Sequence, residues 1–168
     1  GLMLNILRVK GKIKVIPLIL CVLLPLAGSA FVWYITRNGI NIYTQLEKPI
    51  FSPPAYIFMI VWIILYILMG LASYRIYMYR ELGEDIGNAL FYYLIQLLLN
   101  YLWSFIFFSF RLYGLAFIEL IILFIFIIIT FLKFIKLDKI AGYLLIPYIL
   151  WCSFALILNY FIWSKNER

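Results

Sequence analysis

The chain contains no histidine and only two cysteines, and charged residues make up only 12% of it. Histidine is the commonest general base, metal ligand and haem axial ligand, so its absence argues against chemistry that depends on imidazole. Cys21 and Cys152 both lie in apolar stretches and lack metal-ligand spacing, and we expect them to be packing residues. The sequence therefore predicts no metal site, and without a convergent pair of carboxylates it does not favour hydrolytic catalysis.

Hydrophobic residues make up 67% of the 168 residues, and the mean hydropathy is +1.08. This composition leaves too little polar surface to cover a soluble globule. We therefore expect lipid to be the solvent of the protein. Segments such as 118–132 lack the alternation of apolar and polar residues that membrane barrels show. We therefore predict an all-α membrane protein, a bundle of five transmembrane helices in a single domain over residues 1–168. The predicted helices cover about residues 15–36, 55–78, 88–110, 112–132 and 141–163.

The formal net charge of +7 comes from basic residues that stand between apolar segments. Because they do not gather on one polar face, nucleic-acid binding is not expected. Nine of the fourteen Lys and Arg residues flank the N-terminal side of the predicted bundle and five flank the other side, which predicts an N-terminus inside the cell. The nine are Arg8, Lys10, Lys12, Lys14, Arg75, Arg80, Lys133, Lys136 and Lys139, and the five are Arg37, Lys48, Arg111, Lys165 and Arg168.

The high content of Ile, Lys, Asn, Tyr and Phe is typical of AT-rich bacterial genomes, and we therefore expect the protein to lie in the bacterial cytoplasmic membrane.

The longest connection between predicted helices runs from Arg37 to Pro54. Pro49, Pro53 and Pro54 fix their own φ and restrict the residue before each, so this connection should be stiff. A stiff loop over one end of a bundle could serve as a lid. An alternative is a simple turn that starts the next helix and carries interfacial anchors.

Three predicted helices each place aromatic and polar residues on one face. An amide in hydrocarbon needs a partner, which is either another helix or a ligand. The two accounts stay open for Gln96 and Asn100: they hold helices together, or they are polar anchors in an aromatic cavity. The faces are Phe58, Trp62, Tyr66, Met69 and Ser73; Gln96, Asn100, Trp103 and Ser104; and Pro147 with Trp151.

Four motif blocks in this order resemble the TspO/translocator-protein (tryptophan-rich sensory protein) family. They cover about residues 25–166. The sequence departs from the family pattern at two positions. The family usually has Trp where Ile42 stands here. It often has Arg where Ser164 stands, and in this chain the neighbouring Lys165 supplies the charge. The blocks are Tyr43-x-x-Leu46-x-Lys48-Pro49 with Pro53-Pro54; Val61-Trp62-x-x-Leu65-Tyr66-x-x-Met69-Gly70; Gln96-Leu-x-Leu-Asn100-x-x-Trp103; and Tyr143-x-x-x-Pro147-Tyr148-x-x-Trp151-x-x-Phe154 with Leu158-Asn159-Tyr160-x-x-Trp163.

The resemblance implies a five-helix bundle, often a homodimer, whose internal pocket binds porphyrin, haem, sterols and aromatic ligands. Such a protein is a receptor or sensor that needs no cofactor; a transporter of porphyrins or sterols is one alternative. Another is an enzyme that degrades protoporphyrin photo-oxidatively, with Trp62 and Trp151 as its catalytic residues. The implied ligand-binding residues are Tyr43, Pro53, Phe58, Trp62, Tyr66, Gln96, Asn100, Trp103, Pro147, Trp151 and Phe154. A looser sterol-contact pattern comprises Leu158, Tyr160 and Lys165.

Glu119 is the one acidic residue well inside a predicted span. Such residues are costly in hydrocarbon and usually face protein or water, so it is either structural or functional, and the structural role is favoured. Small residues let helix backbones approach closely, and Gly28, Gly70 and Ala72 are predicted to lie at helix contacts.

Overall fold

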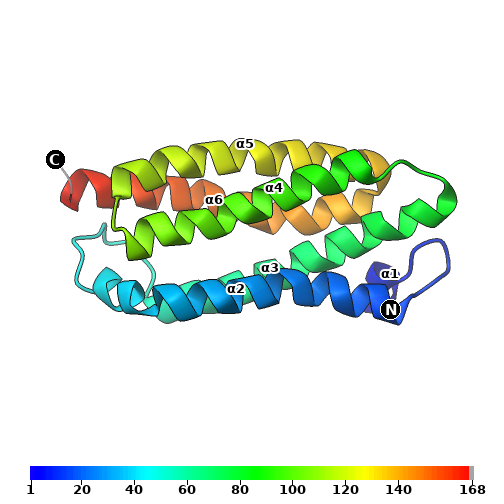
Figure 1. The fold of residues 1–168 in the computed structure, drawn as a ribbon, viewed down its shortest axis with the longest axis horizontal. Helices are drawn as coiled ribbons and strands as arrows, with labels where there is room; N and C mark the ends of the chain where they lie inside the picture. Colours follow the sequence, from blue (N-terminus) through cyan, green and yellow to red (C-terminus); the bar gives the residue numbers. More distant parts are fainter. Residues whose placement is uncertain (167–168) are drawn as a thin grey trace.

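The computed structural model describes residues 1–166, and these form an elongated bundle of long helices (Figure 1). The short helix α1 lies at one end of the bundle and packs against α3. The elements in order are α1 (Leu2–Leu7), α2 (Val15–Tyr43), α3 (Ala55–Met78), the 3₁₀ turn η1 (Tyr79–Leu82), α4 (Gly87–Ser104), the π-helical turn η2 (Phe105–Ser109), α5 (Tyr113–Leu137) and α6 (Lys139–Asn166).

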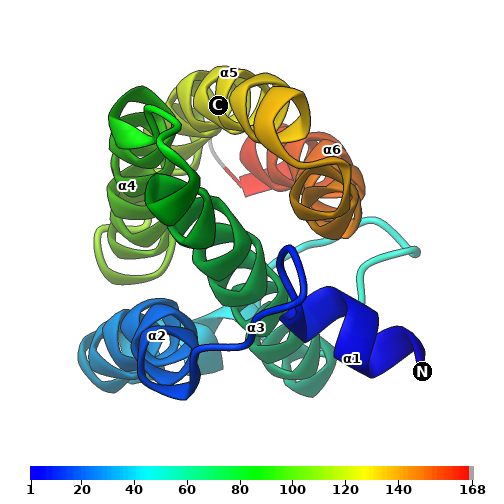
Figure 2. The same cartoon turned by 90° about the vertical axis from the view of Figure 1, so that its right-hand side faces the viewer.

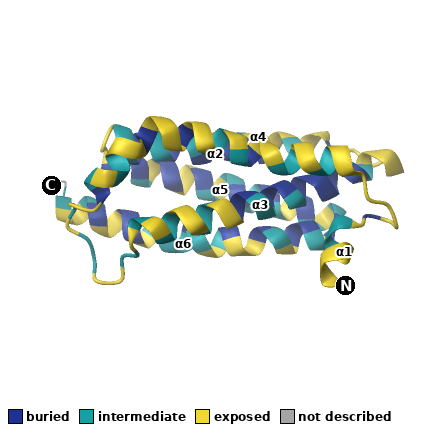
Figure 3. Ribbon diagram, turned by 90° about the horizontal axis from the view of Figure 1, so that it is seen from below, coloured by how far each residue is buried: buried dark blue, intermediate teal, exposed yellow. Residues whose placement is uncertain are grey.

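Five of these helical segments are long and apolar enough to cross a membrane, which confirms the predicted all-α bundle of five transmembrane helices. Their outward faces are exposed and their inward faces are buried (Figure 3). Outward side chains such as Leu98 and Leu150, each 65% exposed, are apolar because they face lipid. Seen from one end, α2 and α3 lie on one side of the bundle and α5 and α6 on the other (Figure 2).

Some boundaries differ from the predicted ones. The first predicted helix ends at residue 36, whereas α2 continues to Tyr43 and takes seven residues from the predicted loop. Tertiary packing explains the extension: Gly39 lies so close to η2 that an added Cβ would be 1.9 Å from the carbonyl oxygen of Phe108. Tyr43, only 3% exposed, packs edge-on against Phe58. The fourth and fifth predicted helices, 112–132 and 141–163, are also longer in the structure, and the third, 88–110, ends in the π-helical turn η2.

Small residues do mark helix contacts, as predicted. A Cβ on Gly70 would lie 2.6 Å from the Cα of Val22 in α2, so the two backbones touch. A Cβ on Gly28 would lie at a similar distance from the side chain of Tyr101 in α4. Ala72 is fully buried.

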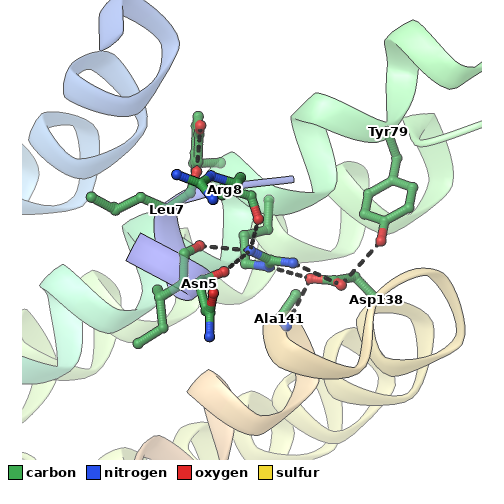
Figure 4. Close-up of polar contacts among 9 residues, drawn as sticks. Asn5, Leu7, Arg8, Tyr79, Asp138 and Ala141 are labelled. Atoms are coloured by element: carbon green, nitrogen blue, oxygen red, sulfur yellow. Dashed lines mark hydrogen bonds and ion pairs between the residues drawn. The ribbon is translucent and has the colours of Figure 1, made fainter. Parts of the chain in front are cut away.

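The N-terminal end of the bundle is closed by a buried ion pair between α3 and the α5–α6 junction (Figure 4). Arg75 Nε donates to Asp138 Oδ2 at 2.5 Å, and Tyr79 donates to Oδ1 of the same carboxylate. Arg75, one of the nine charges assigned to the N-terminal side, lies within the predicted helix 55–78 and inside α3. Its side chain is only 4% exposed, because Asp138 and backbone carbonyls of the N-terminal segment satisfy its guanidinium. Arg168, from the opposite set of charges, lies outside the described residues.

Candidate ligand-binding cavity

A cavity of about 460 Å³ lies between α2, α3 and the end of α4 with η2. Side chains from these elements form its walls, and the residues that line it are uncharged. The lining comprises Leu26, Ser29, Ala30, Val32, Trp33, Thr36, Ile40 and Tyr43 of α2; Ala55, Phe58, Met59, Trp62, Ile63 and Tyr66 of α3; and Trp103, Ser104 and Phe108.

The α3 wall is aromatic because Phe58, Trp62 and Tyr66 recur every four residues and therefore lie on one helical face. The rings of Trp62 and Tyr66 stack with centroids 5.6 Å apart. Trp103 stacks on Phe107 at 4.9 Å, and its indole Nε1 donates to Asn159 Oδ1 at 2.9 Å. The structure thus brings five of the predicted ligand-binding residues to the cavity: Tyr43, Phe58, Trp62, Tyr66 and Trp103.

Most hydroxyl groups of the lining, including those of Ser29, Thr36 and Tyr66, form hydrogen bonds within the protein. Ser29 Oγ donates to the carbonyl oxygen of Leu26, and Thr36 Oγ1 donates to that of Val32. The hydroxyl of Tyr66 donates to Asn100 Oδ1 at 2.5 Å. What the cavity presents is therefore aromatic and aliphatic surface, which can bind a flat apolar molecule by stacking and burial.

Gln96 and Asn100 lie behind this wall, not in it. Asn100 Nδ2 donates to the hydroxyl of Tyr148 at 2.8 Å, and that hydroxyl donates to Gln96 Oε1 at 2.7 Å. Together with Tyr66, this network joins α3, α4 and α6 deep in the bundle. The geometry therefore supports the account in which the two amides hold helices together.

The predicted site residues of α6 also lie away from the cavity. Trp151 packs edge-on against Phe58 with centroids 5.5 Å apart, and its ring is tilted against that of Phe154 at 5.4 Å. Its indole Nε1 is buried and has no hydrogen-bond acceptor within residues 1–166. Pro147 is exposed on the outer face of α6. Phe58 therefore stands between Trp151 and the cavity.

The three residues of the sterol-contact pattern do not share one surface. Leu158 is 4% exposed and lines a small void of about 20 Å³ behind Tyr43 and Phe58. Tyr160 is 47% exposed and contacts Phe117. Lys165 is exposed near the end of α6.

The loop of residues 44–54 is tied to the bundle at both sides of the cavity end. The hydroxyl of Tyr43 donates to the carbonyl oxygen of Pro53 at 3.3 Å. Asn166 at the end of α6 bonds both the backbone N–H and the carbonyl of Glu47. Phe51 packs edge-on against Phe154. These contacts fit a lid, because they fix the loop over one end of the helices that line the cavity.

The α2 wall was missed by the sequence reasoning. Ser29, Trp33, Thr36, Ile40 and Tyr43 recur at spacings of four, three, four and three, which is one helical face. The signal was present, but placing the end of the helix at residue 36 moved Ile40 and Tyr43 into a loop and shortened the pattern.

Comparison with known proteins identifies close relatives. The model of the TspO/MBR family matches residues 21–164. The tryptophan-rich protein TspO of Chlorobaculum tepidum is 36% identical over 152 residues, which cover 88% of this chain and 91% of the relative. The tryptophan-rich sensory protein of Cereibacter sphaeroides is 36% identical, with 74% and 79% of the two chains covered. The translocator protein of Ovis aries is also 36% identical and covers 80% of each chain.

Proposed function

This chain belongs to the TspO/MBR family, and from that premise we propose that it is a membrane receptor or sensor that binds tetrapyrroles, such as protoporphyrin and haem, and related lipophilic ligands. The observation that carries the proposal is the uncharged cavity of about 460 Å³ with an aromatic wall on α3. This volume lies within the range of roughly 300–1,000 Å³ that is usual for small-molecule sites.

The chemistry of the lining fits a flat macrocycle. Phe58, Trp62 and Tyr66 offer ring faces and edges along about two helical turns. Each aromatic contact with a stacked ring is worth about 0.5–1.5 kcal/mol beyond the area that it buries. In this proposal the protein uses no metal or cofactor of its own to bind the ligand. A haem would be held by contacts with its porphyrin ring.

The acidic groups of a porphyrin need a different environment from its ring. Lys48 in the loop lies over the ring of Tyr43, with its ammonium nitrogen 4.7 Å from the ring centroid, and donates to the carbonyl oxygen of Tyr43. Because Tyr43 lines the cavity, we place the propionate groups of a bound porphyrin at the loop end, where Lys48 can pair with them.

The test is a titration of the purified protein with protoporphyrin, haem and cholesterol, followed by porphyrin absorbance and by tryptophan quenching. Ser104→Phe fills the cavity and should lower porphyrin affinity at least tenfold, which is about 1.4 kcal/mol. Ser153→Phe makes the same change on α6, away from the cavity lining, and should leave the affinity within about threefold. Equal affinities in the two variants would place the ligand elsewhere.

A second candidate is transport, which is favoured by the name translocator protein carried by several relatives. The two functions are separated by sealed vesicles that contain the protein. A carrier moves porphyrin across the bilayer faster than protein-free vesicles do, whereas a receptor only retains it. Saturable flux that Ser104→Phe abolishes would favour the carrier.

We further propose a homodimer in the bacterial cytoplasmic membrane with the N-terminus inside. The basic residues at the N-terminal end of the bundle favour this orientation. Crosslinking in native membranes tests the dimer, and protease added to sealed right-side-out vesicles tests the orientation by leaving residues 1–14 intact.

A further inference from the structure

Helix α1 lies across the N-terminal end of the bundle and extends beyond the outline of the other helices (Figure 2). None of its residues is buried, and Leu2, Met3 and Leu4 are 79%, 65% and 47% exposed. It lies at the same end of the bundle as the start of α2, where the first membrane span begins at Val15 (Figure 1). Its apolar side chains are therefore at the level where hydrocarbon meets the lipid headgroups.

A tight hairpin follows α1 and presents basic side chains at the same level. Val9 and Lys12 exchange backbone hydrogen bonds of 2.9 and 3.1 Å. The two residues between them, Lys10 and Gly11, have φ of 51° and 79°, the paired positive values of a two-residue hairpin turn. Lys10 consequently stands at the tip, and the side chains of Arg8, Lys10 and Lys12 are exposed.

This segment is held in one orientation by α3. Arg75 Nη1 donates to the carbonyl oxygens of Asn5, Ile6 and Arg8 at 3.0, 2.6 and 2.9 Å (Figure 4). The hydroxyl of Tyr74 donates to the carbonyl oxygen of Leu7, and Val9, 3% exposed, packs on Tyr74. The segment therefore meets a partner in a fixed geometry.

The neighbouring acidic side chains leave most of the hairpin charge available, although Glu81 also attracts Lys12. Glu81 pairs with Lys14, which we therefore exclude from the surface. Glu84 and Asp85 lie in the connection between η1 and α4, and Asp85 is engaged by the backbone N–H of Gly87. Arg8, Lys10 and Lys12 form no ion pair within residues 1–166.

We propose that residues 2–12 form a binding surface for anionic phospholipid headgroups. Leu2, Met3 and Leu4 enter the interfacial layer, while Arg8, Lys10 and Lys12 pair with lipid phosphates. An exposed apolar face beside a basic cluster at the membrane boundary has the composition that anionic lipid surfaces bind. The surface is separate from the cavity and does not depend on which ligand the cavity takes.

The experiment measures hydrogen exchange of residues 2–12 by mass spectrometry, with one protein molecule per nanodisc. One set of discs contains phosphatidylcholine alone, and the other contains equal parts of phosphatidylcholine and phosphatidylglycerol. We expect about tenfold slower exchange of this segment in the anionic discs. The difference should vanish near 1 M salt, where the screening length is only about 3 Å. Equal exchange in the two kinds of disc overturns the proposal.

Variants separate charge from general destabilisation. Lys10→Gln with Lys12→Gln should remove most of the effect of phosphatidylglycerol, because two surface charges together are worth about 30-fold in binding. Arg37→Gln with Lys165→Gln makes the same charge change at the other end of the bundle and should keep the full effect. A difference between the discs that survives in the hairpin variant overturns the proposal. The proposal is also overturned if residues 2–12 are protected only in discs that hold two protein molecules, with no need for anionic lipid. A second copy of the chain would then cover the surface.

Discussion

Trp62 and Trp151 differ in what their indole rings contact. Trp62 lines the cavity and stacks on Tyr66, whose hydroxyl is fixed by Asn100. Trp151 touches Phe58 and Phe154 and does not line the cavity. A ligand in the cavity would therefore contact the first indole directly and be influenced by the second only through Phe58.

This difference predicts unequal losses of binding. Trp62→Ala should lower protoporphyrin affinity about tenfold, because it removes a stacking face and leaves a void. Trp151→Ala should change affinity by less than about threefold. Absorbance titration measures both without relying on tryptophan emission. Wild-type affinity in the variant that carries both changes would show that the site lies elsewhere.

A further prediction concerns light. Replacing both tryptophans with Phe preserves a ring at each position, so binding should fall less than in the double Ala variant. If the protein degrades protoporphyrin under illumination, the double Phe variant should not, because it lacks an oxidisable indole. The measurement is the rate at which porphyrin absorbance is lost in the light, with dark samples as the control. Undiminished loss in the double Phe variant would remove these residues as the photochemical centre.

Glu119 on α5 is 7% exposed, and neither carboxyl oxygen has a hydrogen-bond partner within residues 1–166. A buried polar group without a partner costs about 1–3 kcal/mol. Glu119→Leu should therefore raise the stability of the protein in detergent by about 1 kcal/mol or more, and Glu119→Gln should change it less. Glu119 does not line the cavity, so porphyrin affinity should stay within about threefold. A loss of affinity at unchanged melting temperature would give Glu119 a functional role.

At the scale of helices, the contact between α2 and α3 fixes one wall of the cavity against another. Gly70 makes that contact possible, since its Cα faces the backbone of Cys21 and Val22 with no room for a side chain. The cavity lies further along the same pair of helices, between Leu26 and Tyr43 on α2 and between Ala55 and Tyr66 on α3. The close crossing therefore sets how far apart the two walls stand.

Gly70→Leu should separate α2 from α3 and lower the melting temperature in detergent. Overpacking of this kind costs about 1–3 kcal/mol or more, because a backbone and not a flexible side chain is displaced. Gly87→Leu is the control, since a Cβ there meets only Asp85 Oδ1 at 3.4 Å. An unchanged melting temperature for Gly70→Leu would mean that the helices are not packed as the structure has them.

At the scale of the whole molecule, one buried carboxylate connects segments that are distant in the sequence. Asp138 pairs with Arg75 of α3, accepts from Tyr79 and caps the first turn of α6 through the backbone N–H of Ala141 at 3.0 Å. Arg75 in turn holds the carbonyls at the end of α1. Removing the carboxylate would leave a buried guanidinium without a counter-charge.

Asp138→Asn should therefore destabilise the protein by about 3–5 kcal/mol, as expected when one partner of a buried ion pair is removed. Lys14→Gln breaks the exposed pair with Glu81, which solvent screens, and should cost far less stability. Thermal unfolding in one detergent measures both. If the two variants melt at the same temperature, the buried pair does not hold the end of the bundle together.

The sequence by itself determined the five spans and the inner face of α3. Hydrocarbon requires every backbone hydrogen bond to be made within the segment, so long apolar runs must be helices wherever they fall in the fold. Phe58, Trp62, Tyr66, Met69 and Ser73 share a face because the helical period is a local property of the chain. The rule that small residues let helix backbones approach closely predicted that Gly70 meets another helix.

Only the tertiary structure decided which helices enclose the cavity. The amides of Asn100 and Gln96 could bind a ligand or another helix. In the structure they form hydrogen bonds with Tyr66 and Tyr148, and these bonds join helices. Trp151 lies behind Phe58, whereas Trp33 and Thr36 of α2 line the cavity. Tyr43 belongs to a helix and not to a loop because Gly39 packs on the backbone of Phe108, a residue far along the chain. Contacts of this kind depend on how the helices cross, and no local pattern in the sequence encodes the crossing.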